Sequence, residues 1–207
     1  MYSNLPNLTL AFHGCDEITF KKVLYHHEQL LPSNNSYDWL GNGIYFWENS
    51  LARAEEWAVS YCKRYNREHP NEESKRPAVI GAVISLGHCL DLTDYGSSQI
   101  LKTGYDILSF ELSVLEKDMP INRDVRGSND LLLRELDCAV IERLHQYNKE
   151  NSKRSYDSVR GIFIEGKPVY DKSGIMEKTH VQICIRNPNC IKGYFKPLIP
   201  DEGWERV

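Results

Sequence analysis

The chain has 207 residues, of which 41% are hydrophobic and 26% charged, an ordinary composition for a soluble globular protein. Its 25 basic and 29 acidic residues give a net charge of −4, which excludes a strong long-range attraction to nucleic acid or anionic lipid. A chain of this length buries about 70% of its unfolded surface, so we expect one domain over residues 1–207 that needs no disulfide or metal.

Six cysteines are spread along the chain without a CxxC pair. Structural zinc sites usually show such close pairs, so we predict no metal site and expect reduced thiols. The opening segment, MYSNLPNLTL, has neither the basic nor the long apolar part of a signal peptide. No apolar stretch approaches the ~20 residues that span a bilayer. We therefore expect a cytoplasmic protein without membrane contact.

The first half of the chain predicts two strands and two helices. Residues 8–12 (LTLAF) indicate a short buried strand that ends at a His-Gly pair. Apolar positions at helical spacing favour an amphipathic helix from 16 to about 30. The segment GNGIYFWE (41–48) is typical of a strand entered through two glycines, and residues 51–65 carry the helical pattern again.

The second half begins with a polar segment of mixed charge, residues 66–76, which we expect to be a solvated loop. Ser128, Asn129 and Asp130 form a good cap for a later helix. The apolar patterns of the remaining chain predict strands at 77–86, 90–92, 159–164, 181–185 and 191–195, and helices at 97–116 and 128–147. Because strands flank a helical middle, the pattern indicates an α+β fold rather than alternating βαβ units.

Three segments carry the residues whose chemistry stands out: LAFHGC (10–15), GNGIYF (41–46) and QICIRNPNCI (182–191). Alone, a His-Gly pair is more typical of a turn, and a glycine-rich strand more typical of backbone freedom. In this order, the three segments resemble motifs of the ADP-ribosyltransferase superfamily. The resemblance is to its His-Tyr-Glu branch, which contains the poly(ADP-ribose) polymerases and the diphtheria-type toxins.

The resemblance runs from about residue 9 to residue 196, because AVISLGHCLDL (82–92) also resembles the family strand that follows the second motif. The helical stretch at about 96–150 matches nothing in the family and is treated as an insertion. The resemblance implies a split β-sandwich, in which two small antiparallel sheets hold NAD in the cleft between them and helices pack outside.

The resemblance implies that NAD is the co-substrate and gives roles to four residues. His13 would hydrogen-bond a ribose hydroxyl on the adenosine side, and Gly14 would hold the nicotinamide carboxamide through its backbone. Tyr45 would lie against the nicotinamide ring, and Gly43 would let the backbone approach the pocket closely. Cleavage of the nicotinamide–ribose bond passes through an oxocarbenium-like state, so the site must fix both groups and stabilise positive charge.

The family places a second aromatic residue on the following helix, and here Trp57 occupies that place. Ala54 would be the small residue that faces the carboxamide, and Tyr61 is the alternative stacking partner. Two rings around nicotinamide would add ~0.5–1.5 kcal/mol per contact beyond area burial. A core-packing role for Trp57 is equally compatible with its position on an amphipathic helix.

The main departure from the family is Gln182, which stands where the resemblance implies a catalytic glutamate. Glutamine can accept the same hydrogen bond but carries no charge, which costs about 10²–10³ in rate. Three explanations are open. The enzyme could be a mono-transferase with a reactive acceptor, it could use another carboxylate (Glu177, Glu48 or Glu135), or it could bind NAD without turnover.

His180 lies two residues before Gln182 and therefore projects to the same side of the strand. The resemblance gives it an acceptor-contacting role, and the alternative is a structural one. We expect a mono-ADP-ribosyltransferase that modifies a macromolecular acceptor, either protein or nucleic acid. Its size resembles that of bacterial toxins or defence effectors, for which a neutralising antitoxin or immunity protein would be a partner. A silent NAD-binding domain and an NAD glycohydrolase are the alternatives.

Overall fold

The computed structural model describes residues 8–124, 130–198 and 203. Among the helices in these ranges, none is long and apolar enough to cross a membrane. The elements follow in chain order as β1 (Thr9–Asp16), α1 (Glu17–Tyr25), β2 (Ile44–Glu48), α2 (Leu51–Glu68), β3 (Pro77–Ile84), β4 (Cys89–Asp91), α3 (Tyr95–Val114), β5 (Asn122–Arg123), β6 (Leu133–Arg134), α4 (Glu135–Glu150), β7 (Ser158–Phe163), β8 (His180–Ile185), η1 (Pro188–Cys190) and β9 (Ile191–Phe195).

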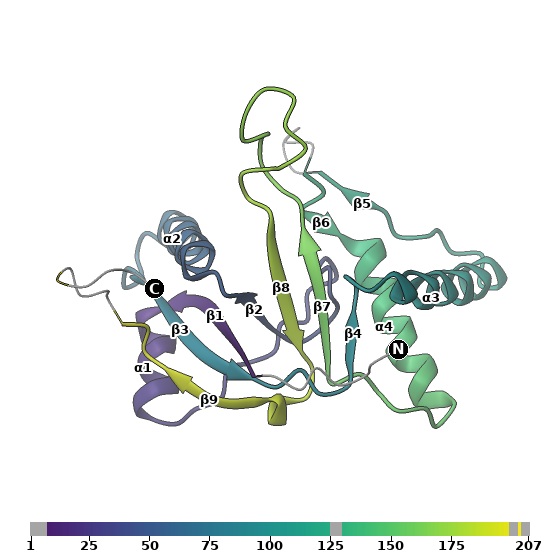
Figure 1. Cartoon of the computed structure of the whole chain (residues 1–207), viewed down its shortest axis with the longest axis horizontal. Helices are drawn as coiled ribbons and strands as arrows, with labels where there is room; N and C mark the ends of the chain where they lie inside the picture. The colour runs from purple at the N-terminus through teal and green to yellow at the C-terminus, as the bar shows by residue number, and fades with distance from the viewer. Residues whose placement is uncertain (1–7, 125–129, 199–202, 204–207) are drawn as a thin grey trace.

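Seven strands form one mixed sheet in the order β4-β7-β8-β2-β1-β3-β9 (Figure 1). Neighbouring strands run antiparallel except β4 and β7, which are parallel. The strands β5 and β6 form a separate short ladder. The α+β class expected from the sequence is confirmed, but the two small sheets expected from the resemblance are joined into one.

The joint between the two halves of the sheet is narrow. The strand β1 pairs with β3 along its whole length, Thr9 to Asp16. With β2 it pairs at two positions, Ala11 with Glu48 and Phe12 with Trp47. On the β2 side of β1 the regular ladder therefore ends just before His13.

One face of the sheet is covered by α1 and the segment that follows it. The strands β1, β2, β3 and β8 contribute alternate apolar side chains to this core, as expected from the period of two along a strand. Phe46, Ile80 and Ile183 are fully buried in it, and Val23 of α1 and Leu30 close it from outside.

Two groups of helices cover the other face. The helix α2 packs on β1 and β3, while α3 and α4 pack over β7 and β8 (Figure 1). The strands β2 and β8 lie between these groups. On this face they carry Tyr45, Trp47, His180, Gln182 and the buried Cys184, and we call the first four the central strip.

The helix α4 begins later than predicted. Its first residue is Glu135, and Arg134 at its N-cap makes no side-chain capping bond. Instead, Asn122 on β5 accepts hydrogen bonds from the backbone N–H groups of Leu136 and Asp137. The predicted local cap at 128–130 is therefore wrong, although its residues 128 and 129 lie outside the described ranges. The cap comes from a residue thirteen or more positions earlier, which no local pattern reveals.

The segment expected to be a solvated loop is partly anchored. The helix α2 continues to Glu68, and Lys75 lies near the end of the connection to β3. Its Nζ is 2.9 Å from Oδ2 of the buried Asp16 and donates to the Tyr61 hydroxyl at 2.8 Å. These bonds fix the connection at the start of β3.

Candidate active site

His13 fills the place where the β1–β2 ladder stops. Its Nδ1 lies 2.8 Å from the backbone oxygen of Tyr45. Because a carbonyl oxygen only accepts, Nδ1 carries the proton and Nε2 is left as an acceptor. Burial lowers the pKa of His13, and the bond to Tyr45 raises it by less. The site therefore presents a neutral imidazole that can accept a hydrogen bond from a hydroxyl group.

Tyr45 is fixed by its phenol as well as by its strand. The hydroxyl donates to the Gly41 oxygen at 2.7 Å and accepts from the Leu40 N–H at 3.0 Å. Burial raises the phenol pKa far above its ordinary value. The hydroxyl is thus committed to the turn before β2, and the ring is left as a half-buried wall of the central strip.

The glycines of the two motifs are required by packing between elements. A Cβ on Gly14 would collide with the carbonyl oxygen of Ala54, so this glycine lets α2 lie directly on β1. A Cβ on Gly43 would lie 2.5 Å from the Cys184 sulfur on β8. Gly14 and Ala54 are therefore brought together as expected, while the close neighbour of Gly43 is β8.

Trp57 and Tyr45, the two rings expected to lie on either side of nicotinamide, have no described contact with each other, and their role toward nicotinamide stays a prediction. The Trp57 ring lies 5.9 Å from that of Trp47 and stacks on Tyr61 at 5.2 Å, and Tyr45 is not among its described ring contacts. Trp47 was missed as a site residue. It directly follows GNGIYF and has the parity of Tyr45, which is the signal that could have identified it.

Gln182 is held by bonds to both ends of its amide. The register places it opposite Trp47 on β2 and Gly161 on β7. Its Oε1 accepts from the Trp39 indole N–H at 3.3 Å, and its Nε2 lies 3.1 Å from Nε2 of His180. The amide orientation is therefore set, with one N–H and one lone pair free for other partners.

His180 orients Gln182 in this structure. Its Nδ1 is 2.6 Å from the Lys178 oxygen, so Nδ1 donates and Nε2 accepts from the Gln182 amide. The ring stacks on Phe163 at 5.1 Å, and burial lowers its pKa. With both nitrogens engaged, the acceptor-contacting role needs one of these bonds to break, and it stays a prediction.

The three carboxylates considered as substitutes have other partners. Glu48 follows Trp47 and so projects to the opposite face from Gln182. There it accepts two hydrogen bonds from Arg160, at 2.6 and 3.0 Å. Glu135 pairs with Arg123 at 2.8 Å, and Glu177 lies in the β7–β8 loop near the Lys167 N–H.

Glu165 is a carboxylate that sequence reasoning missed. Phe163 pairs with His180, and the Lys178 N–H donates to the Glu165 oxygen at 3.1 Å, which continues this ladder. Alternation therefore places Glu165 on the face of Gln182. Burial raises its pKa, although it pairs with Arg53 of α2 at 3.1 Å. The parity is visible in the sequence, but the register with β8 is not.

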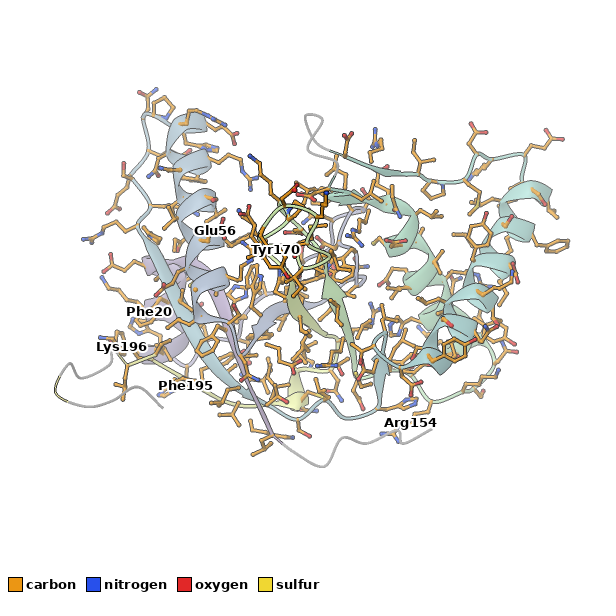
Figure 2. The ribbon with its side chains drawn as sticks, turned by 45° about the horizontal axis from the view of Figure 1, so that its top comes forward. Phe20, Glu56, Arg154, Tyr170, Phe195 and Lys196 are labelled. Atoms are coloured by element: carbon orange, nitrogen blue, oxygen red, sulfur yellow. The ribbon has the colours of Figure 1, made fainter. Side chains whose placement is uncertain are left out.

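A chain of ion pairs joins α2 to the β7–β8 loop beside the central strip. Arg53 bonds Glu56 on its own helix and Glu165 at the end of β7. Glu56 in turn bonds Lys178 before β8. Figure 2 shows Glu56 on α2, on the side of the molecule where the β7–β8 loop carries Tyr170. The alternating charges balance, so the strip is bordered by a neutral network.

A cavity of about 400 Å³ lies between α3 and α4, beside the central strip. Its walls are mostly apolar and include Leu101, Val140 and Ile141. Trp39 lines it and also bonds Gln182, so this indole separates the cavity from the strip. The guanidinium of Arg134 lies 4.8 Å from the centre of the Trp39 ring. The described residues that line this cavity include none of the site residues predicted from the sequence.

Comparison with known proteins gives one distant relative. The chain is 26% identical over 200 residues to the uncharacterized protein MJ0359 of Methanocaldococcus jannaschii, an alignment that covers 87% of this chain and 83% of that protein. No family model matches the chain, and no solved structure matches it. The site must therefore be interpreted from its own geometry.

Proposed function

We propose that the protein is an NAD-dependent mono-ADP-ribosyltransferase with an ADP-ribosyltransferase-like fold. One observation carries the proposal: three residues from distant segments lie on adjacent strands around the narrow joint of the sheet. His13 bonds the Tyr45 backbone at 2.8 Å, and β2 places Trp47, two residues after Tyr45, directly opposite Gln182. The nicotinamide end of NAD would bind where the β1–β2 ladder stops.

The hydrogen-bonding groups fit a ribose. Nε2 of the neutral His13 can accept from a ribose hydroxyl, and the Gln182 amide can both donate and accept there. Since Gln182 carries no charge, its stabilisation of an oxocarbenium-like state is weaker than a carboxylate's. Transfer of a single ADP-ribose to a reactive acceptor, protein or nucleic acid, is compatible with this weaker site.

A second candidate is an NAD-binding domain without turnover. The observation that favours it is the commitment of Glu48 and Glu135 to ion pairs with Arg160 and Arg123. Neither carboxylate is free to replace the missing charge beside Gln182. The two candidates share one binding site and differ in chemistry.

Radiolabelled NAD separates the candidates. The purified protein is incubated with adenylate-labelled NAD, with and without cell extract, and nicotinamide release is measured in parallel. Label on a protein or nucleic acid supports the transferase, and nicotinamide release without an acceptor indicates a glycohydrolase. Calorimetric NAD binding with neither product supports the silent domain.

Tyr45→Ala tests whether the activity belongs to this site. Loss of the ring and of two hydrogen bonds to the turn before β2 should abolish NAD-dependent activity. Tyr95→Ala is the matched control, because Tyr95 is 86% exposed on α3. Full turnover by the Tyr45 variant would show that the pocket lies elsewhere. A toxin or defence role, with a neutralising partner protein, is a further part of the proposal.

A further inference from the structure

Among the described residues, four buried side-chain nitrogens have no hydrogen-bond partner: Trp47 Nε1, Arg53 Nε, Arg143 Nη1 and His145 Nε2. Two of the four, Trp47 and Arg53, belong to the central strip and the α2 wall beside it. The other two are on α4. A buried donor without a partner loses its bonds to water with nothing in return, so each such group needs an explanation, and a bound ligand is one of them.

Trp47 projects onto the central strip. It is 6% exposed, has the parity of Tyr45 on β2, and stands opposite Gln182 across the β2–β8 ladder. Its ring is tilted by 48° against that of Trp57. The indole N–H is therefore a buried donor on the residue that the ladder places opposite Gln182.

The second donor belongs to Arg53 of α2, the helix that packs on β1 and β3. It lies one helical turn before Trp57 on α2, so both side chains share one face of the helix. Its two terminal nitrogens bond Glu56 and Glu165, which leaves the Nε hydrogen unpaired. Both unpaired groups, on Trp47 and Arg53, can donate but cannot accept.

We propose that Trp47 Nε1 and Arg53 Nε are ligand contacts that donate to oxygen atoms of the ribose-phosphate part of NAD. This inference rests on the proposed function. The ribose hydroxyl and phosphate groups supply several acceptor oxygens for two donors on different elements. The nicotinamide carboxamide offers a single oxygen, whose two lone pairs would serve both donors only if the two converged on it.

Calorimetric titration with ADP-ribose and with nicotinamide tests the inference. In Trp47→Phe and Arg53→Lys, the affinity for ADP-ribose should fall by about tenfold, the effect of one lost hydrogen bond. The affinity for nicotinamide should not change. Arg53→Lys keeps a cation beside Glu56 and Glu165 but removes the Nε donor. Arg143→Lys is the matched control, because Arg143 also has an unpartnered nitrogen but lies on α4.

A second substitution guards against misfolding. Phenylalanine leaves space beside Trp57, whereas 3-benzothienylalanine at position 47 keeps the ring shape and replaces the N–H by sulfur. Unchanged affinity for ADP-ribose in both position-47 variants would overturn the inference while the proposed function stands. An equal loss of affinity for nicotinamide would also overturn it. If the unmodified protein binds neither NAD nor ADP-ribose, the proposed function fails, and the inference fails with it.

Discussion

The central strip and the α3–α4 region differ in how closely their side chains pack. Between α3 and α4, mostly apolar walls line an open cavity of about 400 Å³. In the strip, the indole of Trp47 is buried against Trp57, and amide and imidazole groups are linked in a chain from Trp39 through Gln182 to His180. This cavity thus lies beside the chemistry-bearing side chains rather than among them. We therefore place the proposed site by its hydrogen-bonding side chains and not by the volume of the α3–α4 cavity.

Burial lowers the pKa of His13, His180 and His145, but the three imidazoles differ in their hydrogen bonds. The Nδ1 atoms of His180, in the strip, and of His13, on the neighbouring strand β1, bond backbone oxygens, which fixes each tautomer. In α4, His145 is buried with Nε2 unpartnered, and burial lowers its pKa to about 4. Hydrogen bonds therefore orient the imidazoles of His13 and His180, whereas His145 packs against the Tyr156 ring.

Gln182→Glu should give the largest effect, and it tests whether the central strip, rather than the α3–α4 region, carries the chemistry. A carboxylate opposite Trp47 supplies the missing charge, so we expect the transfer rate to rise by about 10²–10³. A carboxylate cannot donate to Nε2 of His180, so the variant favours a protonated His180 and raises its pKa. The protonated imidazole offsets part of the added charge, so the gain should grow as the pH rises through that raised pKa, which a pH–rate profile measures. An unchanged rate with intact NAD binding would remove Gln182 from the reacting centre.

His145 should make the α4 region sensitive to acid. Its pKa is lowered from 6.5 to about 4 by burial first and then by Arg186, so the unfolded chain binds the proton more readily than the folded one. The free energy of unfolding should fall by about 3 kcal/mol as the pH drops from 6.5 to 4. His145→Phe should flatten this part of the profile in urea unfolding. The same slope in the variant would assign the acid sensitivity to other groups.

Gly14→Ala tests the contact that holds α2 beside the strip. The added Cβ meets the Ala54 carbonyl oxygen, so α2 must shift, and we expect a loss of about 1–3 kcal/mol in unfolding free energy. Gly174→Ala is the control, because a methyl group added there would have no atom of the described residues within 4 Å. Its change should stay within about 0.5 kcal/mol. Equal effects at both glycines would mean that α2 is not held against β1.

Glu165→Gln should give the smallest effect, and it tests whether the ion pairs beside the central strip support activity. The change removes the charge that pairs with Arg53 at 3.1 Å, on the face of Gln182. We expect about a tenfold loss in kcat/KM, equivalent to one charge-assisted bond. Glu48→Gln should leave kcat/KM unchanged, because Glu48 projects to the opposite face. A loss of kcat/KM in Glu48→Gln with none in Glu165→Gln would mean that Glu48, and not Glu165, supports the reaction.

The sequence predicted most elements because their periodicity is local. The strands β1, β2, β3, β7, β8 and β9 lie within a few residues of the expected ranges. The resemblance implied that the strands of His13, Tyr45 and Gln182 lie side by side, and β2 does lie between β1 and β8. Their use of NAD stays a prediction.

What the sequence could not predict depends on register and on distant contacts. The parallel pairing of β4 with β7 joins segments that no short pattern connects. The contact of Trp57 with Trp47 was not predicted, because it depends on how α2 packs across the sheet and not on a local pattern. The start of α4 was misplaced because its cap is Asn122, on another element.

The most direct test of the account is a crystal structure with a non-cleavable NAD analogue, in which a methylene replaces the ribose ring oxygen. We predict that the nicotinamide lies where the β1–β2 ladder stops, against the Gly14 backbone and the Tyr45 ring, with a ribose oxygen within hydrogen-bond distance of Gln182. A dinucleotide bound in the α3–α4 cavity, with the central strip unchanged, would contradict the account.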